Sequence, residues 1–289
     1  MNTLVAVATL TDREFGQIQE LVYREAGIFL SKEKKALVVA RLGRRLRELQ
    51  IQSFGEYYSR AHESNDERRR LLDAICTNET HFFREPRQFE FLERQIIPAW
   101  RREASAGRRR RCVRVWSAAC STGEEPFSIA MLLRYALPSD WAIELLASDL
   151  STQVLARAQA AVWPIARSEE IPPVLLKAFM LRGVEAHSGL MKASSELRSL
   201  ATFRHINLND ERYDVGQFDL VFCRNVLMYF SDDSRTRVIL RLLKHLTPSG
   251  YLFLGHAESL NRVTDRVKNV GPTVYAHADQ DETFLGAAG

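Results

Sequence analysis

Residues 112–126, Cys-Val-Arg-Val-Trp-Ser-Ala-Ala-Cys-Ser-Thr-Gly-Glu-Glu-Pro, decide the fold. The apolar run Cys112–Ser117 is followed by small residues, by a single glycine at Gly123, and by Pro126, which can begin a helix. This order predicts a buried strand, a tight loop and a helix N-terminus. Small residues let the backbone approach a ligand closely, and the first turn of a helix offers free N–H groups.

Downstream of this stretch, apolar runs alternate with amphipathic segments as far as a C-terminal hairpin at 267–277. Strands that alternate with helices predict an α/β fold with a doubly wound, mostly parallel sheet. The expected strands are Ile143–Ser148, Phe218–Cys223 and Tyr251–Gly255, and the expected helices are Pro126–Leu137, Thr152–Ala161 and Asp232–Leu246. Residues 181–204 are polar and punctuated by glycine, so we predict a small β insert there.

Upstream, the elements are all expected to be helical. Thr11–Glu14 forms a capping box, and Ser31 can cap a helix that runs to about Gln50. The face of that helix opposite its apolar stripe carries Arg41, Arg44 and Arg45, among other basic residues. We predict a helical N-terminal domain at 1–85, a linker helix and basic linker at 86–111, and a ligand-binding domain at 112–289.

Composition narrows the class of protein. The 289 residues are 46% hydrophobic, which excludes a disordered chain, and no apolar run reaches the roughly 20 residues of a membrane helix. Four scattered cysteines without a CxxC pair predict neither a disulfide scaffold nor a zinc site. A secretory signal is not recognisable, so we expect a soluble, cytoplasmic protein without a metal.

Charge is unevenly distributed along the chain. Residues 1–111 hold 22 basic and 16 acidic residues, net +6, whereas the remainder holds 18 and 20, net −2. Such asymmetry indicates a partner-facing surface for nucleic acid, anionic membrane or acidic protein.

The loop after Gly123 also indicates the ligand. Glu124 and Glu125 would repel a phosphate, although they could simply favour the helix dipole. Asp149 ends the second strand about 25 residues later, where an acidic residue can accept both hydroxyls of a ribose, or can cap the next helix. A nucleoside ligand without phosphates and with an ammonium group satisfies both features, which predicts S-adenosylmethionine.

Five blocks of the chain resemble the chemotaxis receptor glutamate methyltransferases of the CheR family. They are Thr77–Arg84 (TNETHFFR), Trp116–Pro126, Ala147–Leu150, Phe222–Phe230 (FCRNVLMYF) and Gly255–Ser259. The resemblance implies a class I methyltransferase domain with a small β subdomain, preceded by an all-helical domain. It further implies methyl transfer from S-adenosylmethionine to receptor glutamates, with S-adenosylhomocysteine as product.

The resemblance also implies roles for individual residues. The cofactor would be bound by Asn78, Thr80, Arg84, Glu124, Asp149, Asn207, Leu208, Asn225 and Val226. Arg84 and Tyr229 would orient the substrate carboxylate. The basic face of Arg41, Arg44 and Arg45 would bind the acidic receptor helices, and the insert at 181–204 would hold the receptor's C-terminal tail peptide by strand addition.

Two other functions are compatible with this sequence. A nucleic-acid methyltransferase would suit the basic balance, although the chain lacks the NPPY-type tetrapeptide of base-modifying enzymes. A non-catalytic cofactor sensor could have the same fold.

Overall fold

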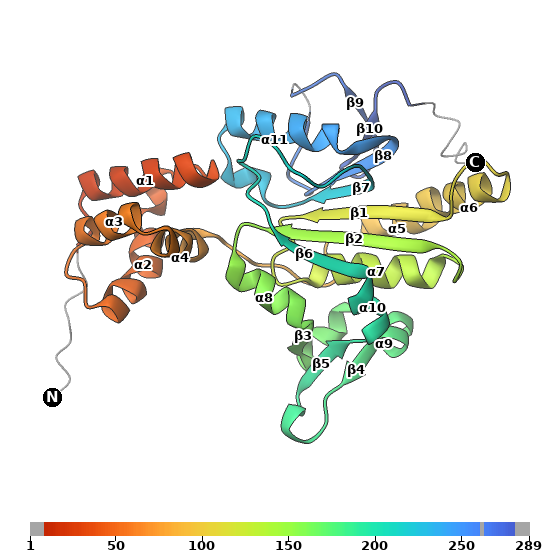
Figure 1. The fold of residues 1–289 in the computed structure, drawn as a ribbon, viewed down its shortest axis with the longest axis horizontal. Helices are drawn as coiled ribbons and strands as arrows, with labels where there is room; N and C mark the ends of the chain where they lie inside the picture. Colours follow the sequence, from red (N-terminus) through yellow and green to blue (C-terminus); the bar gives the residue numbers. More distant parts are fainter. Residues whose placement is uncertain (1–8, 261–262, 281–289) are drawn as a thin grey trace.

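The computed structural model describes residues 9–260 and 263–280, arranged as a helical domain, a large sheet covered by helices, and a small sheet (Figure 1). The large sheet has seven strands and the small sheet three. The helical domain and the small sheet lie at different sides of the large sheet in Figure 1.

The helical domain forms its own apolar core, in which Ile18, Leu42 and Phe54 are completely buried. Its helices are α1 (Asp12–Ala26), α2 (Lys35–Leu49), α3 (Phe54–Glu63) and α4 (Asn65–Ile75). The predicted capping box at Thr11 is confirmed, since Thr11 accepts from the Glu14 N–H and the Glu14 carboxylate accepts from the Thr11 N–H. The helix expected from Ser31 begins instead as a 3-10 turn, η1 (Lys32–Lys34).

The large sheet confirms the doubly wound prediction. Its order is β6-β2-β1-β7-β8-β10-β9, and its first five strands run parallel to one another. The strands are β1 (Cys112–Ala118), β2 (Ala142–Asp149), β6 (Ala201–His205), β7 (Phe218–Cys223), β8 (Leu246–Leu254), β9 (Val267–Gly271) and β10 (Val274–His277). The chain turns from one side of β1 to the other after β6, so the topological switch point lies between β1 and β7.

Helices cover both faces of this sheet. One face carries α5 (Pro86–Phe91), the π-helical segment η2 (Leu92–Ile96), α6 (Ile97–Ser105) and α7 (Glu124–Ala136), whereas α11 (Asp232–Lys244) packs on the other. Phe89, Leu92 and Trp100 are buried in the same cluster as α7. The segment predicted as a linker helix is therefore part of the sheet's core, because its apolar stripe finds a partner there.

The small sheet lies beside α7 and has the antiparallel order β3-β5-β4. Its strands are β3 (Val162–Pro164), β4 (Met180–Arg182) and β5 (Leu190–Ala193), connected and flanked by α8 (Thr152–Ala160), η3 (Ile165–Glu170), α9 (Pro173–Phe179), η4 (Glu185–His187) and α10 (Ser195–Leu200). The predicted insert at 181–204 differs from this sheet at both ends. The small sheet begins earlier, at Val162. Residues Ala201–His205 belong instead to the large sheet, where they pair with β2, and no local pattern indicates this because β2 lies more than 50 residues away in sequence.

Two further features concern the whole described chain. Among residues 9–260 and 263–280, no helix is both long and apolar enough to cross a membrane. Within the same residues, no three His, Cys, Asp or Glu side chains are grouped closely enough to hold a metal ion.

Candidate active site

A cavity of about 310 Å³ lies at the carboxyl ends of β1, β2 and β7, where these strands face the helical domain. A doubly wound sheet binds its ligands at this switch point. The cavity is lined by Asn78, Thr80, Arg84, Glu125, Asp149, Asn207, Leu208, Asn225, Val226 and Tyr229, together with residues of α1, α2 and the β1 loop. Nine of the ten residues predicted for the cofactor and the substrate carboxylate therefore line one cavity, and the tenth, Glu124, is not among its described lining residues.

Asp149 ends β2 with a nearly buried carboxylate, 7% exposed. One carboxylate oxygen accepts from the Ser121 N–H and the other from the Ser151 N–H, both at 2.9 Å. Burial raises the pKa of Asp149 above its ordinary value, against the effect of these hydrogen bonds. A carboxylate has about four acceptor sites, so acceptor capacity for a ribose hydroxyl remains where a nucleoside ligand needs it.

The loop after β1 approaches its surroundings closely. Gly123 has φ +97°, and a Cβ there would lie 3.0 Å from the backbone of Ala158. Phe83, Glu85, Ala119, Ser121 and Asn225, five of the nine non-glycine residues with positive φ in the described chain, lie at or beside the cavity. Such conformations cost roughly 1–3 kcal/mol each and persist where surrounding contacts hold them, typically at functional sites.

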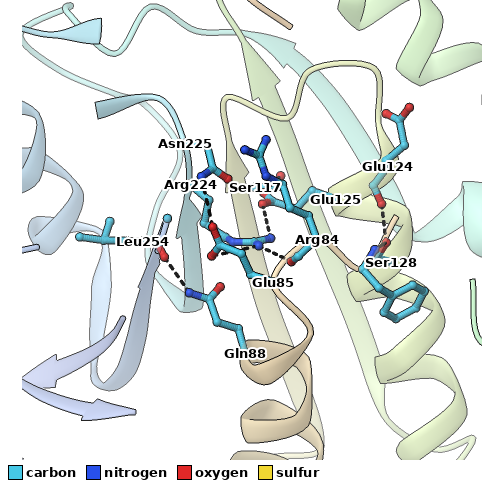
Figure 2. Close-up of polar contacts among 12 residues, drawn as sticks. Arg84, Glu85, Gln88, Ser117, Glu124, Glu125, Ser128, Arg224, Asn225 and Leu254 are labelled. Carbon is cyan, nitrogen blue, oxygen red and sulfur yellow. Dashed lines mark hydrogen bonds and ion pairs between the residues drawn. The ribbon is translucent and has the colours of Figure 1, made fainter. Parts of the chain in front are cut away.

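The two acidic residues of this loop have separate surroundings. Glu125 lines the cavity and accepts from the Ser117 hydroxyl at 2.6 Å, whereas Glu124 is not among the described residues that line it. The Glu124 carboxylate points away from that of Glu125 (Figure 2) and accepts from the Thr122 hydroxyl at 2.6 Å. Burial raises the pKa of both carboxyls. The geometry thus places Glu125 at the cavity wall, and Glu124 remains a prediction.

The segment between α4 and α5 crosses the sheet edge and carries Asn78, Thr80 and Arg84. The Asn78 carbonyl accepts from the Ser121 hydroxyl at 2.9 Å, and the Thr80 carbonyl accepts from Arg167 of η3 at 3.1 Å. Arg84 donates to the Glu79 carbonyl at 3.0 Å. These contacts connect the segment both to the β1 loop and to the small sheet.

The loops after β6 and β7 complete the opposite wall. Asn207 donates from Nδ2 to the Glu25 carbonyl at 2.6 Å, which joins the end of α1 to the sheet domain. The cofactor-binding role predicted for Asn207 therefore shares that side chain with a domain contact. Tyr229 lies under the ammonium group of Lys34, 5.3 Å from the ring centre, and its carbonyl accepts from the Phe29 N–H at 2.7 Å.

A buried charge cluster (Figure 2) contributes Arg224 and Glu125 to the cavity wall. The Arg224 side chain is 2% exposed, donates to Glu125 at 3.0 Å and to the Arg84 carbonyl, and lies 3.3 Å from a Glu85 oxygen. Although burial opposes it, the charge of Arg224 and hydrogen bonds from His256 and Asn225 hold the pKa of Glu85 below its usual value. Two carboxylates share one guanidinium, so the cluster suits a cationic ligand nearby.

Sequence reasoning gave no role to Glu85, Arg224 or Glu258. The buried Glu258 carboxylate accepts from the backbone N–H groups of Asn225 at 2.9 Å and Leu227 at 2.7 Å, and it thereby shapes the loop after β7. A usable signal was present for Arg224, because a charged residue directly follows the apolar strand Phe218–Cys223 at the ligand-binding edge.

The predicted receptor-binding arginines are engaged to different degrees. Arg45 forms two hydrogen bonds to the nearly buried Glu67 carboxylate at 2.8 and 2.7 Å, and Arg41 donates to the Ile75 carbonyl and to Thr77. Arg44 is 82% exposed and pairs only with Glu48 among the described residues. The three line one groove, together with Glu48, Arg70, Asp73, Ala74, Gln153 and Arg157.

Comparison with known proteins assigns this arrangement to a family. Residues 78–276 match the family described as "CheR methyltransferase, SAM binding domain", and residues 13–76 match "CheR methyltransferase, all-alpha domain". The chain belongs to the CheR methyltransferase family. The predictions of the family, the fold class, the enzyme class and the cofactor are thereby confirmed, and the protein is a methyltransferase that uses S-adenosylmethionine.

Curated relatives of this CheR-family chain match it over nearly its whole length. "Chemotaxis protein methyltransferase 2" of Pseudomonas aeruginosa is 41% identical over 93% of this chain and 94% of its own. "Chemotaxis protein methyltransferase" of Salmonella typhimurium is 38% identical over 92% of this chain and 91% of its own. These names do not favour the alternative of a nucleic-acid methyltransferase.

Proposed function

We propose that this CheR-family protein transfers the methyl group of S-adenosylmethionine to glutamate side chains of methyl-accepting chemotaxis receptors. The observation that carries the proposal is a single cavity that combines two sets of groups. Asp149 and the β1 loop offer a nucleoside site, and Arg84 and Tyr229 offer a cation and a hydroxyl to a carboxylate. The names of the relatives support chemotaxis as the context. The proposal places the enzyme in the cytoplasm, with the signalling helices of those receptors.

The chemistry requires positioning more than proton transfer. S-adenosylmethionine supplies a methyl group activated by a positively charged sulfur. A glutamate carboxylate is already ionised at neutral pH, because its ordinary pKa is about 4.3, so the protein need not provide a general base. Arg84 and Tyr229 would hold the carboxylate in line with the methyl group, and the walls of the cavity would exclude water.

The groove along α2 and α4 supports an acidic helix as the docking partner. Five of its lining residues are the arginines Arg41, Arg44, Arg45, Arg70 and Arg157, against two acidic residues. A positive groove attracts an acidic helix over distances of about 8–10 Å at physiological salt. It therefore guides the helix to the enzyme more than it strengthens the final complex.

The small sheet supports a second contact, with an extended tail peptide of the receptor. β4 is an edge strand, and Leu181 and Val184 in and after it are 56% and 70% exposed. An exposed edge offers unpaired backbone groups to an added strand, and apolar side chains give that strand selectivity. Such a tether would raise the local receptor concentration into the mM range.

The deciding experiment is transfer of labelled methyl groups to receptor signalling fragments, compared with RNA and DNA. We expect label on the receptor fragments that is released as methanol in mild alkali, because a glutamyl methyl ester hydrolyses there. Label that withstands alkali, or that appears on nucleic acid, would contradict the proposal. Cofactor binding without transfer to any of these would favour the cofactor sensor.

A further inference from the structure

One carboxylate joins three segments of the active site that are far apart in sequence (Figure 2). Oε1 of Glu85 accepts from Nδ2 of Asn225 at 3.1 Å and from the backbone N–H of His256 at 2.9 Å. Oε2 lies 3.3 Å from Nη2 of Arg224. Asn225 follows β7, His256 follows β8 and Glu85 precedes α5, so a single side chain connects the three.

The backbone around Glu85 needs such a connection. Phe83 and Glu85 have φ of 51° and 63°, so Arg84 lies between two left-handed residues. The Phe83 N–H donates to the Ser128 hydroxyl at 3.0 Å, and the Arg84 carbonyl accepts from Arg224. The direction of the Arg84 side chain therefore depends on a conformation that ordinary residues disfavour and that these contacts maintain.

The partners of Glu85 have little room to rearrange. A Cβ on Gly255 would lie 2.6 Å from Nδ2 of Asn225 and 2.7 Å from Oε2 of Glu258. Asn225 itself has a left-handed φ of 57°, and its N–H is held by Glu258 at 2.9 Å. With Asn225 and Arg224 fixed in this way, the position of the Glu85 carboxylate determines that of the segment before α5.

We infer that Glu85 is a positioning residue, whose carboxylate holds Arg84 and Asn225 at the same cavity so that the substrate carboxylate and the cofactor meet in a fixed geometry. The inference rests on the proposed function, because it assigns Arg84 to the substrate. It does not make Glu85 a catalytic residue, since Glu85 is not among the described residues that line the cavity and its contacts are to protein groups.

The test compares Glu85→Gln and Glu85→Ala with Asp219→Asn. Asp219 offers a matched control: its carboxylate is 16% exposed against 17% for Glu85, pairs with Arg109 at 2.6 Å and accepts from the Arg114 N–H at 2.8 Å, at the opposite end of the sheet. We expect kcat on receptor fragments to fall about 10-fold for Glu85→Gln and about 100-fold for Glu85→Ala. The affinity for S-adenosylhomocysteine should fall less than kcat, because Asp149 is unchanged, and Asp219→Asn should lower Tm without lowering kcat.

A double-mutant cycle separates positioning from general structural support. If Glu85 acts through Arg84, then Glu85→Ala should have little further effect on kcat in an Arg84→Ala background. Losses of kcat that multiply would overturn the inference, as would an equal loss of kcat in Asp219→Asn.

Hydrogen exchange tests the same inference without any substrate. Glu85→Ala should speed exchange of backbone amides in residues 78–85 and 224–229, whereas Asp219→Asn should leave these segments unchanged. Unchanged exchange in Glu85→Ala would overturn the inference. A wild-type enzyme that is inactive on receptors would instead contradict the proposed function, while the exchange result would still decide the role of Glu85.

Discussion

The cavity wall and the arginine groove both contain charged side chains, but the degree to which water surrounds these charges differs. Asp149 is 7% exposed and the Arg224 side chain 2%, whereas the Arg44 side chain is 82% exposed. Buried charges interact strongly because little water screens them, and each requires fixed partners. Exposed charges gain little from any one partner and are weakened by salt. We therefore expect ligand binding in the cavity to depend on single residues. Attraction of a partner by the groove should depend on the summed charge of its residues.

Arg45 lies in the groove but resembles the cavity in its contacts. Its guanidinium reaches across from α2 to α4, where two hydrogen bonds bind the Glu67 carboxylate. The carboxylate is 7% exposed, so removal of the arginine would leave a buried negative charge without its main partner. The boundary between structural and partner-facing residues thus falls within one helix.

The largest expected effect sharpens this boundary. Arg45→Ala should lower the free energy of unfolding by roughly 3 kcal/mol, because breaking a buried ion pair leaves one charge uncompensated. Arg44→Ala should change it by less than about 0.5 kcal/mol, as is typical of exposed pairs. Urea denaturation of both variants measures the difference. Equal stabilities would show that Arg45 belongs with the exposed residues.

The second effect concerns the cavity. Asp149→Ala should weaken binding of S-adenosylhomocysteine by roughly 1.5–3 kcal/mol, since a charge-assisted hydrogen bond to the ribose is lost. Asp140→Ala is the control, because Asp140 lies just before the other end of β2 and pairs with Arg111 at the surface. Calorimetry on folded proteins checks both variants. An unchanged affinity in Asp149→Ala would contradict the assignment of the ribose site.

The third effect is a dependence on pH. The ionised carboxylate of Asp149 is the stronger acceptor for the ribose hydroxyls, and burial raises its pKa. The protonated fraction of Asp149 therefore grows as pH falls through this raised pKa. On acidification, the affinity for S-adenosylhomocysteine should begin to fall at a pH above the ordinary aspartate pKa of ~4. This one group can lower the affinity by at most about tenfold per pH unit. Calorimetric titrations between pH 8 and 5 measure it. An affinity that rises on acidification would contradict the prediction.

The smallest expected effect belongs to the groove. Arg44→Glu should raise the apparent KM for receptor fragments a few-fold at low salt, and the increase should vanish at high salt because the attraction is screened. Arg102→Glu, at an exposed position of α6, makes the same change in net charge away from the groove. Steady-state kinetics at two salt concentrations distinguish the variants. Equal KM values for the two would remove the groove from the docking surface.

Much of the site could be predicted because its chemistry follows strand ends. Asp149 ends a strand, Glu125 follows a strand and a tight loop, and Asn225 comes two residues after another strand. Parallel strands bring their carboxyl ends to one edge, so residues at those positions meet whatever the rest of the chain does. The roles of Asn225, Arg84 and Tyr229 were predicted through the resemblance, and neither Arg84 nor Tyr229 lies at a strand end.

The remaining contacts required the tertiary structure, because they join elements that no local pattern connects. β6 was predicted within the insert but belongs to the large sheet. Its pairing with β2 was not predicted because β2 is more than 50 residues away in sequence. Glu124 and Glu125 are neighbours in sequence, yet the N-terminus of α7 turns their carboxylates to different surroundings. Glu85, Arg224 and Glu258 come from three separate segments and meet only in the folded protein.

The sequence by itself determined the alternation of strands and helices and the edge of the sheet that carries the site. The hydrophobic period suffices for these, since it is repeated over many residues. Most of the residues predicted around the cofactor came from the family resemblance. Only the tertiary structure decided which charges are buried together and which arginines of α2 remain free for a partner. Burial is a property of the packed chain. It changes the interaction energy between two charges far more than their neighbours in sequence do, because buried charges are little screened by water.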